Sequence, residues 1–230
     1  MPAPVVRIRD LSFAWRPGTA PVLLIDGLEI DRGEKLFIEG PSGSGKTTLL
    51  SILGAVVVPG AGSVSIMDQD IAGMSGAARD RFRADHIGFI FQMFNLIPYL
   101  STVDNVLLAC HFSTRRREQL SRRDHPPAQE ATRLLSRLGL TEAESTRPAT
   151  ELSVGQQQRV AAARALIGSP EIVIADEPTS ALDMDARRDF LALLFEECDS
   201  AGSTLLFVSH DRSLGPLFDR RIPLRDINRA

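Results

Sequence analysis

The chain has 230 residues, 43% hydrophobic and 24% charged, which is enough to bury the core of one large α/β domain. Its formal net charge of −3 gives no basic excess and argues against a nucleic-acid partner. Cys110 and Cys198 are isolated and lack metal-ligand spacing, which is typical of a reduced, cytosolic compartment. We expect no membrane-spanning helix, and the pattern of Met1–Val5 does not predict a signal peptide.

The first part of the chain reads as strands around a glycine-rich loop. Each strand is an alternating or continuous apolar segment bounded by turn residues, and the helix follows the loop directly. The predicted strands are Val5–Trp15, Val22–Ile30, Lys35–Glu39, Ser63–Ile71 and Ile87–Phe91, and the predicted helix is Lys46–Leu53.

After Gln92 helical patterns dominate until about Arg159, and short apolar strands then return. The helical segments before Arg159 are Thr102–His111 and Ala128–Leu138. The strands after it are Ile172–Ala175 and Leu205–Ser209, with a helical segment at Asp183–Cys198 between them. Fully apolar strands of this length suit a buried parallel sheet. We therefore expect one domain over residues 1–230, with a doubly wound α/β core (1–91 and about 160–230) and a helical subdomain at about 92–159.

An arginine-rich stretch lies inside the helical part. Residues 115–137 contain seven arginines against three acids, with Pro126-Pro127 between them. A charge run of this kind is typical of a solvated loop and helix face, and a partner-docking surface is the alternative.

The glycine-rich loop stands between a strand and a helix, the context of a phosphate-binding loop. Backbone N–H groups from Gly43 to Thr48 are expected to converge on a β-phosphate, helped by the positive end of the helix. Lys46 would supply charge to the β- and γ-phosphates, and Thr47 would ligate Mg²⁺. The predicted ATP-binding residues here are Gly40, Pro41, Ser42, Gly43, Ser44, Gly45, Lys46, Thr47 and Thr48.

Polar side chains at the ends of three apolar strands are candidates for the chemistry. Asp176 would hold Mg²⁺, and Glu177 would orient and deprotonate the attacking water. Gln92 is a candidate for the metal or the water, and His210 for a hydrogen bond to the γ-phosphate. Taken singly, a Gln or His at a strand end is more often structural.

Leu152–Val160 is a second helix N-terminus shaped for phosphate, sixteen residues before Asp176. A serine–glycine turn opens a helix rich in Gln and Arg. One chain holds one triphosphate and yet has two phosphate sites, so the second site is expected to serve the nucleotide of another copy.

These motifs occur in one order: glycine loop, Gln92, Leu152–Val160, Asp176-Glu177, Ser180–Asp183 and His210. In that order the whole chain resembles the nucleotide-binding subunit of ATP-binding cassette (ABC) transporters. The segments 86–92 and 152–160 look most similar to the lipoprotein-release (LolD) and macrolide-export (MacB) ATPases and to the cell-division ATPase FtsE, which work with FtsX-type permeases. The resemblance implies the P-loop NTPase fold of that family, with an antiparallel N-terminal β region and an inserted helical subdomain.

The resemblance also implies a dimer and a membrane partner. Two subunits would close head to tail around two ATP molecules with Mg²⁺, so that Ser153, Gly155 and Gln156 face the γ-phosphate held by the other copy's Lys46. Ser180–Asp183 would run along the dimer seam. Trp15 stands where the family stacks an aromatic ring on adenine, the alternative being a buried or turn-capping Trp. Gln92 and the helical subdomain would receive a coupling helix of an integral membrane permease.

Val154 occupies a position where the family most often has glycine. A right-handed helical conformation would cost valine only tenths of a kcal/mol, whereas a positive φ would strain it.

The expected function is therefore that of an ATPase subunit that energises a separate FtsX-type permease and lies in the cytoplasm, on the inner face of the membrane. The alternative is a regulatory or scaffold module that uses ATP-dependent dimerisation to signal through a membrane partner, as in FtsE.

Overall fold

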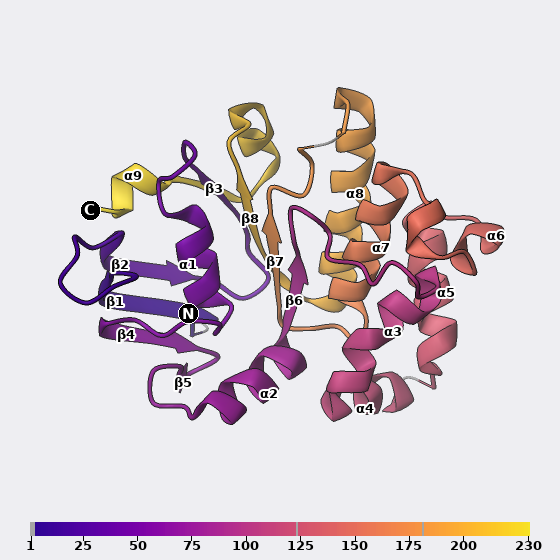
Figure 1. Ribbon diagram of the computed structural model, residues 1–230, viewed down its shortest axis with the longest axis horizontal. Coiled ribbons are helices and arrows are strands. Elements are labelled where there is room, and N and C mark those ends of the chain that lie inside the picture. Colours follow the sequence, from indigo (N-terminus) through magenta and orange to yellow (C-terminus); the bar gives the residue numbers. More distant parts are fainter. Residues whose placement is uncertain (1–2, 123, 181) are drawn as a thin grey trace. The chain divides into compact units, whose positions relative to one another are not determined.

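The computed structural model describes residues 3–122, 124–180 and 182–230 (Figure 1). Met1 and Pro2 of the N-terminal segment, Arg123 of the arginine-rich stretch and Ala181 of the predicted seam segment lie outside the described residues. The chain forms two compact units. Unit 1 comprises Met1–Arg83 and Thr204–Ala230, and unit 2 comprises Ala84–Ser203. The predicted boundaries of core and helical subdomain stay a prediction.

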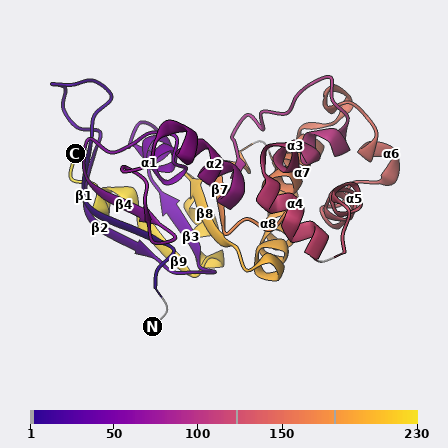
Figure 2. The same ribbon diagram turned by 90° about the horizontal axis from the view of Figure 1, so that it is seen from below.

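Unit 1 contains an antiparallel sheet with the strand order β2-β1-β4-β5. Its strands are β1 (Val6–Phe13), β2 (Leu23–Ile30), β4 (Ala61–Ile66) and β5 (Gln69–Asp70). Figure 2 shows β2, β1 and β4 side by side. Buried and more exposed residues alternate through much of β1 and β2, so this sheet has one core face, as antiparallel sheets commonly do.

Unit 1 also contains parallel strands, in which β3 (Lys35–Glu39) pairs with β8 (Thr204–Ser209) on one side and β9 (Arg220–Pro223) on the other. All six residues of β8 are buried, and so are four of the five in β3. Strands buried on both faces are the signature of an α/β core. Helix α1 (Lys46–Leu53) follows β3, and the C-terminal segment adds η2 (Arg212–Leu217) and α9 (Leu224–Ile227).

Unit 2 pairs β6 (Ile87–Ile90) with β7 (Ile172–Asp176) in parallel and is otherwise helical. Helix α2 (Gly76–His86) leads into it from unit 1. The helical elements of unit 2 are α3 (Thr102–Phe112), α4 (Thr114–Arg122), α5 (Pro127–Arg137), α6 (Glu142–Ser145), η1 (Ala149–Glu151), α7 (Val154–Leu166) and α8 (Met184–Ala201).

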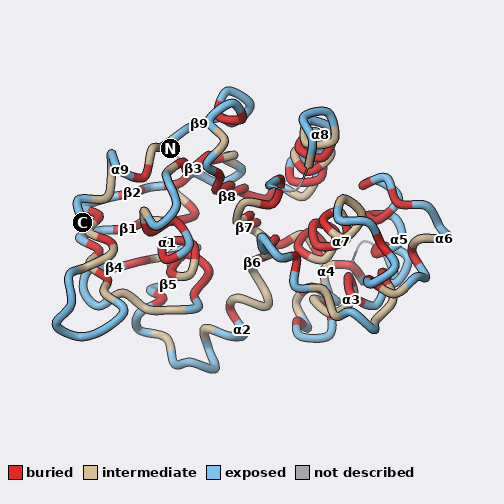
Figure 3. The backbone as a smooth tube through the Cα atoms, turned by 45° about the horizontal axis from the view of Figure 1, so that its top comes forward, coloured by how far each residue is buried: buried red, intermediate tan, exposed pale blue. Residues whose placement is uncertain are grey.

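Helix α7 is the central element of unit 2 and contacts α3, α5, α8 and β6 (Figure 1). Figure 3 shows much of its length in red, because Val160–Ala163 and Ala165–Leu166 are all buried. Small alanine side chains let its backbone come close to β6. A Cβ atom on Gly88 would lie 2.1 Å from the Ala165 carbonyl oxygen, so only glycine fits there.

Most predicted elements are confirmed to within one or two residues, including the continuous strand, loop and helix at 35–53. Helix α8 begins after an Asp183 cap and ends at Gly202, which has a φ of 66°. The single strand predicted at Ser63–Ile71 is wrong. Met67 and Asp68 both adopt positive φ (52° and 62°) and turn the chain between β4 and β5.

The arginine-rich stretch is not simply the solvated loop and helix face that was predicted. Arg116 of α4 is only 2% exposed, and Glu130 of α5 is buried beside Arg133. Charge counting missed this because the sequence does not show that main-chain carbonyls surround Arg116. Helix α4 itself was also unforeseen, as were α2 and the edge strand β9.

Candidate functional site

The glycine-rich loop joins β3 to α1 in unit 1 and has the backbone expected of a phosphate cradle. Gly43 and Gly45 have φ angles of 79° and 98°, which L-residues with a side chain rarely adopt. Gly45 begins α1 without a side-chain cap, so the first N–H groups of the helix have no capping side chain. The N–H groups and the positive end of a helix N-terminus favour an anion.

Lys46 lies inside this loop and is only 6% exposed. Its Nζ donates hydrogen bonds to the carbonyl oxygens of Gly40 (2.7 Å) and Pro41 (2.9 Å). The ammonium group is therefore held against the main chain of the glycine-rich loop. Thr47 is exposed at the start of α1, and the buried side chains of Thr48 and the following leucines anchor the helix.

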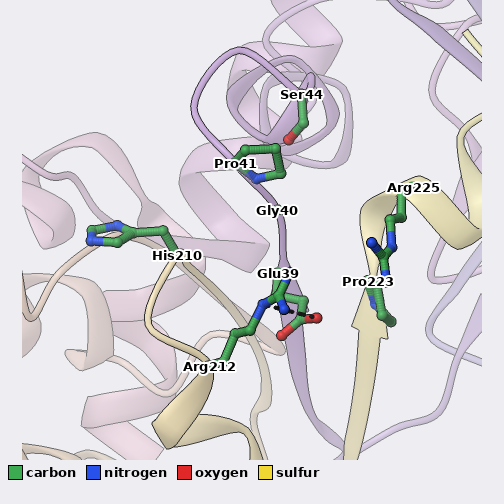
Figure 4. A pocket seen from close by; sticks show the side chains of 8 residues that line it. All are labelled: Glu39, Gly40, Pro41, Ser44, His210, Arg212, Pro223 and Arg225. Atoms are coloured by element: carbon green, nitrogen blue, oxygen red, sulfur yellow. Dashed lines mark ion pairs between the residues drawn. The ribbon is translucent and has the colours of Figure 1, made fainter.

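A cavity of about 400 Å³ opens beside the loop, and His210 lines it together with part of the loop (Figure 4). The lining residues are Glu39, Gly40, Pro41, Ser44, His210, Arg212, Pro223 and Arg225. The structure thus brings the predicted His210 and the predicted phosphate loop to one cavity, although about 165 residues separate them in the sequence.

Glu39 is a buried carboxylate directly before the loop, and no sequence pattern predicted its burial. It is 3% exposed and pairs with Arg221 of β9 at 2.6 Å and with Arg212 at 3.8 Å. The hydrogen bond from Arg221 lowers the pKa of Glu39, against the opposing effect of burial. The carboxylate therefore stays ionised at neutral pH and is balanced by arginines.

Trp15 is exposed on the antiparallel part of unit 1. It follows β1, is 58% exposed, and meets Phe13 edge to face with ring centroids 5.1 Å apart. The alternative of a Trp buried in the core is therefore excluded. An exposed ring whose orientation is restricted by its contact with Phe13 can stack one face on a planar base.

In unit 2, Gln92 and the predicted carboxylates both follow shortly after the last residue pair of β6 and β7. Ile90 pairs with Ala175 in parallel register, so residues 91 and 92 lie one and two positions further on, as do Asp176 and Glu177. Gln92 is exposed, and both acids are partly exposed. Glu177 has a φ of 46°, a left-handed conformation uncommon outside glycine and frequent at functional sites.

The N-terminus of α7 carries the second predicted phosphate site. Ser153 caps the helix by accepting a hydrogen bond from the Gln156 N–H, and Ser153 and Val154 are exposed. Val154 is the first helical residue and does not have positive φ. Valine at this position therefore costs only tenths of a kcal/mol in helix propensity, without backbone strain. A Cβ on Gly155 would meet Leu182 of the Ser180–Asp183 segment at an ordinary 3.5 Å.

Gln156 is already occupied within unit 2. Its Oε1 accepts from the Ser153 N–H at 2.8 Å, and its Nε2 donates to Glu144 at 2.5 Å. The side chain therefore builds the helix start, and direct contact with a nucleotide would require one of these bonds to open.

Sequence reasoning missed Arg164, which lies near the C-terminal end of α7. Its guanidinium donates to the carbonyl oxygens of Phe94 and Asn95, two and three residues after the predicted Gln92. A lone arginine in the apolar run Val160–Ile167 was the only sign available in the sequence.

Within the described ranges, no helix combines the length and apolar character needed to cross a bilayer. The same ranges hold no cluster of three or more His, Cys, Asp or Glu side chains suited to a metal ion. The predicted Mg²⁺ donors, Thr47, Gln92 and Asp176, are instead a mixed set of oxygen donors, the class that Mg²⁺ prefers.

Known proteins match both the sequence and the structure. Residues 26–180 match the ABC transporter family. The lipoprotein-releasing system ATP-binding protein LolD of Porphyromonas gingivalis is 40% identical, over 96% of this chain and 97% of its own. The macrolide export ATP-binding/permease protein MacB of Sodalis glossinidius is also 40% identical, over 98% of this chain. The chain spans only 34% of that longer protein.

Among solved structures, the ATP-binding cassette MJ0796, a dimer in a post-hydrolysis state bound to ADP and Pi, superposes with a TM-score of 0.82. It is 34% identical and covers 95% of this chain and 93% of its own. The chain belongs to the ABC transporter family. It is an ABC-type ATPase cassette, as the resemblance to the LolD and MacB subunits predicted.

Proposed function

We propose that two copies of the chain close head to tail around two ATP molecules and that this closure energises a separate membrane permease. The observation that carries the proposal is the exposed start of α7, where Ser153 and Val154 stand at a helix N-terminus within unit 2. Unit 1 has its own helix N-terminus for phosphate, at Gly45. Two such termini in a chain that holds one triphosphate are accounted for when the second serves the other copy.

In this arrangement the loop residues 40–48 hold the phosphates and Trp15 stacks on the adenine. Ser153 and Gly155 of the other copy approach the γ-phosphate, with the positive end of α7 behind them. The Ser153 hydroxyl accepts from Gln156 and keeps its own hydrogen for a phosphate oxygen. His210 donates a hydrogen bond to the γ-phosphate from its position beside the loop.

Mg²⁺ would be held by Thr47, Gln92 and Asp176, and when bound it supplies charge that neutralises the phosphate oxygens. Glu177 accepts a proton from the attacking water and holds that water in line with the γ-phosphate. The left-handed backbone of Glu177 supports this role, because such strain persists where the surrounding structure requires a fixed direction.

The permease is proposed to dock on the loop after β6. Phe91, Met93 and Tyr99 are exposed there, the last two to 80% and 81%. Large apolar side chains at that exposure are typical of a contact surface. The name of MacB, a macrolide export ATP-binding/permease protein, supports a permease as the partner. With such a partner, the chain would lie on the inner face of the membrane.

The Glu177→Gln variant tests this function. We expect it to bind ATP, to form a stable dimer, and to lose hydrolysis by a factor of about a thousand or more, because the water loses its base while the phosphate contacts remain. Light scattering after gel filtration with ATP measures the dimer, and phosphate release measures turnover.

Glu118→Gln, on the exposed face of α4, is the matched control and should behave as the wild type. A Glu177→Gln protein that binds ATP and stays monomeric contradicts the head-to-tail dimer. Near-normal turnover in that variant removes Glu177 from its catalytic role.

A further inference from the structure

The loop that follows β6 is folded tightly around Gln92. The Phe94 N–H donates to the Phe91 carbonyl oxygen at 2.9 Å, and the Asn95 N–H donates to the Met93 carbonyl oxygen at 2.6 Å. Phe94 and Asn95 have φ angles of 57° and 49°, two consecutive left-handed residues without a glycine. Phe94 is buried. Such a conformation persists only where the surroundings hold it in place.

Arg164 of α7 holds this turn. One Nη donates to the Asn95 carbonyl oxygen at 2.6 Å and the other to the Phe94 carbonyl oxygen at 2.5 Å. Burial lowers the pKa of Arg164, but a guanidinium remains protonated in proteins. Both acceptors are main-chain oxygens of the two left-handed residues, so the planar fork of the arginine fixes the direction of the backbone at that point.

The helix that carries Arg164 is itself fixed at this end. The Ala165 carbonyl oxygen lies so close to Gly88 of β6 that no side chain fits between them. Arg116 donates to the carbonyl oxygens of Ala165 at 3.2 Å and Ile167 at 2.7 Å. The C-terminal end of α7 and strand β6 are thus firmly packed against each other, and Arg164 extends this packing to the loop.

Gln92 lies between two fixed points. Ile90, two residues before it, is paired in the sheet with Ala175. Phe94 and Asn95, two and three residues after it, are held by Arg164. Only residues 91–93 lie between these points, and all three are exposed. The backbone on which the Gln92 side chain stands is therefore set by the sheet on one side and by Arg164 on the other.

We propose that Arg164 is a positioning residue for Gln92, which fixes the loop so that the Gln92 amide meets the metal ion and the attacking water. This inference rests on the proposed function, which assigns Gln92 to that site. Arg164 touches neither nucleotide nor metal in this account, and its effect on turnover passes through Gln92 alone.

A double-mutant cycle tests the proposal with Arg164→Ala, Gln92→Ala and the double variant, in steady-state Mg²⁺-ATPase assays. We expect each single variant to lose kcat by about tenfold or more, while the KM for ATP stays within about threefold, because the phosphate loop is untouched. The double variant should be no slower than Gln92→Ala alone, because a positioning residue has no effect once its target is gone. Losses that multiply overturn the proposal.

The Mg²⁺ dependence separates positioning from a general loss of structure. The half-saturating Mg²⁺ concentration should rise in both Arg164→Ala and Gln92→Ala. Arg159→Ala is the matched control on the same helix, since its guanidinium donates to the Leu138 carbonyl oxygen at 2.6 Å, away from the loop. In that control the Mg²⁺ requirement should be unchanged, and any loss of kcat should multiply with that of Gln92→Ala.

Arg164→Lys keeps a charged donor but lacks the planar guanidinium with its two parallel N–H groups. It replaces Arg164→Ala in these assays if the alanine variant does not fold. A folded lysine variant with intermediate kcat and a raised Mg²⁺ requirement supports the proposal, and one with wild-type values for both overturns it. If Gln92→Ala turns over like the wild type, the assignment of Gln92 in the proposed function is wrong. If Gln92→Ala is impaired and Arg164→Ala is not, only the positioning role is wrong.

Discussion

Trp15 illustrates how a single side chain gains a role from its exposure. A large indole ring that is 58% exposed loses much of the hydrophobic stabilisation that burial would give it. Its edge contact with Phe13 restricts the ring without covering it. A ring held in this way loses little conformational entropy when a base stacks on it, which is the physical case for an adenine contact.

Trp15→Ala should weaken ATP binding by about 1–3 kcal/mol, the scale of base–aromatic stacking. Titration with a fluorescent ATP analogue measures the change, with Trp15→Phe as the control that keeps an aromatic face. The stacking role is refuted if the alanine variant binds nucleotide as tightly as the wild type.

Gln156 illustrates the opposite case, in which the structure gives a predicted ligand another task. Its amide closes the capping box of α7 and reaches Glu144, whose own carboxylate closes the capping box of α6. Two helix starts are thus linked through one side chain. The direction of the α7 N-terminus depends on this link, whether or not Gln156 also meets the nucleotide.

At the scale of elements, Arg116 of α4 holds the C-terminal end of α7 in place through hydrogen bonds. The guanidinium donates to main-chain carbonyls of Ala84, Ile87, Ala165 and Ile167, at distances between 2.7 and 3.2 Å. Burial lowers its pKa to about 10, so the side chain stays charged at neutral pH. A cation at the C-terminal end of α7 is also favoured by the helix dipole.

Arg116→Ala should lower the free energy of unfolding by about 3–5 kcal/mol, because several buried carbonyl oxygens lose their donor together. Urea denaturation followed by circular dichroism measures the loss. Arg122→Ala, at the exposed end of the same helix, should stay within about 0.5 kcal/mol of the wild type. Equal free energies of unfolding in the two variants would show that Arg116 does not stabilise the packing of α4 against α7.

At the scale of the whole molecule, the proposed chemistry is divided between the two units of the chain. Unit 1 carries the phosphate loop, Trp15 and His210, and unit 2 carries Gln92, Ser153 and the carboxylates after β7. The exposed apolar loop that is proposed to meet the permease belongs to unit 2 as well. The residues that would sense the partner and those that would hold the water therefore share one compact unit.

Met93→Asp combined with Tyr99→Asp should prevent co-purification with the membrane partner in detergent, with affinity falling by about thirtyfold or more, because charge is placed in an apolar contact. Leu217→Asp, which alters another exposed apolar side chain, is the matched control and should leave the complex intact. Retention of the partner by the double variant contradicts docking at this loop.

Vesicles that hold the complex then separate the two functional hypotheses. Substrate that stimulates ATP hydrolysis is expected of a transporter. A partner that binds the chain without any such stimulation supports a regulatory or scaffold module.

The sequence by itself determined the elements whose signals are local. The strand, glycine loop and helix at 35–53, the start of α8 and the apolar strands β7 and β8 were all predicted close to their observed bounds. The order of the motifs also gave the family. In each of these cases the residues that impose the conformation lie within a few positions of it, so a pattern can reveal them.

Only the tertiary structure decided the roles of Arg116, Arg164 and Glu39. Each acts on groups far along the chain, main-chain carbonyls for the two arginines and the guanidinium of Arg221 for the glutamate. Every residue has the same main-chain carbonyl, so a sequence pattern cannot predict which carbonyl oxygens will surround a cation. Folding brings these groups together, and the free energy of pairing them when buried fixes what each side chain does.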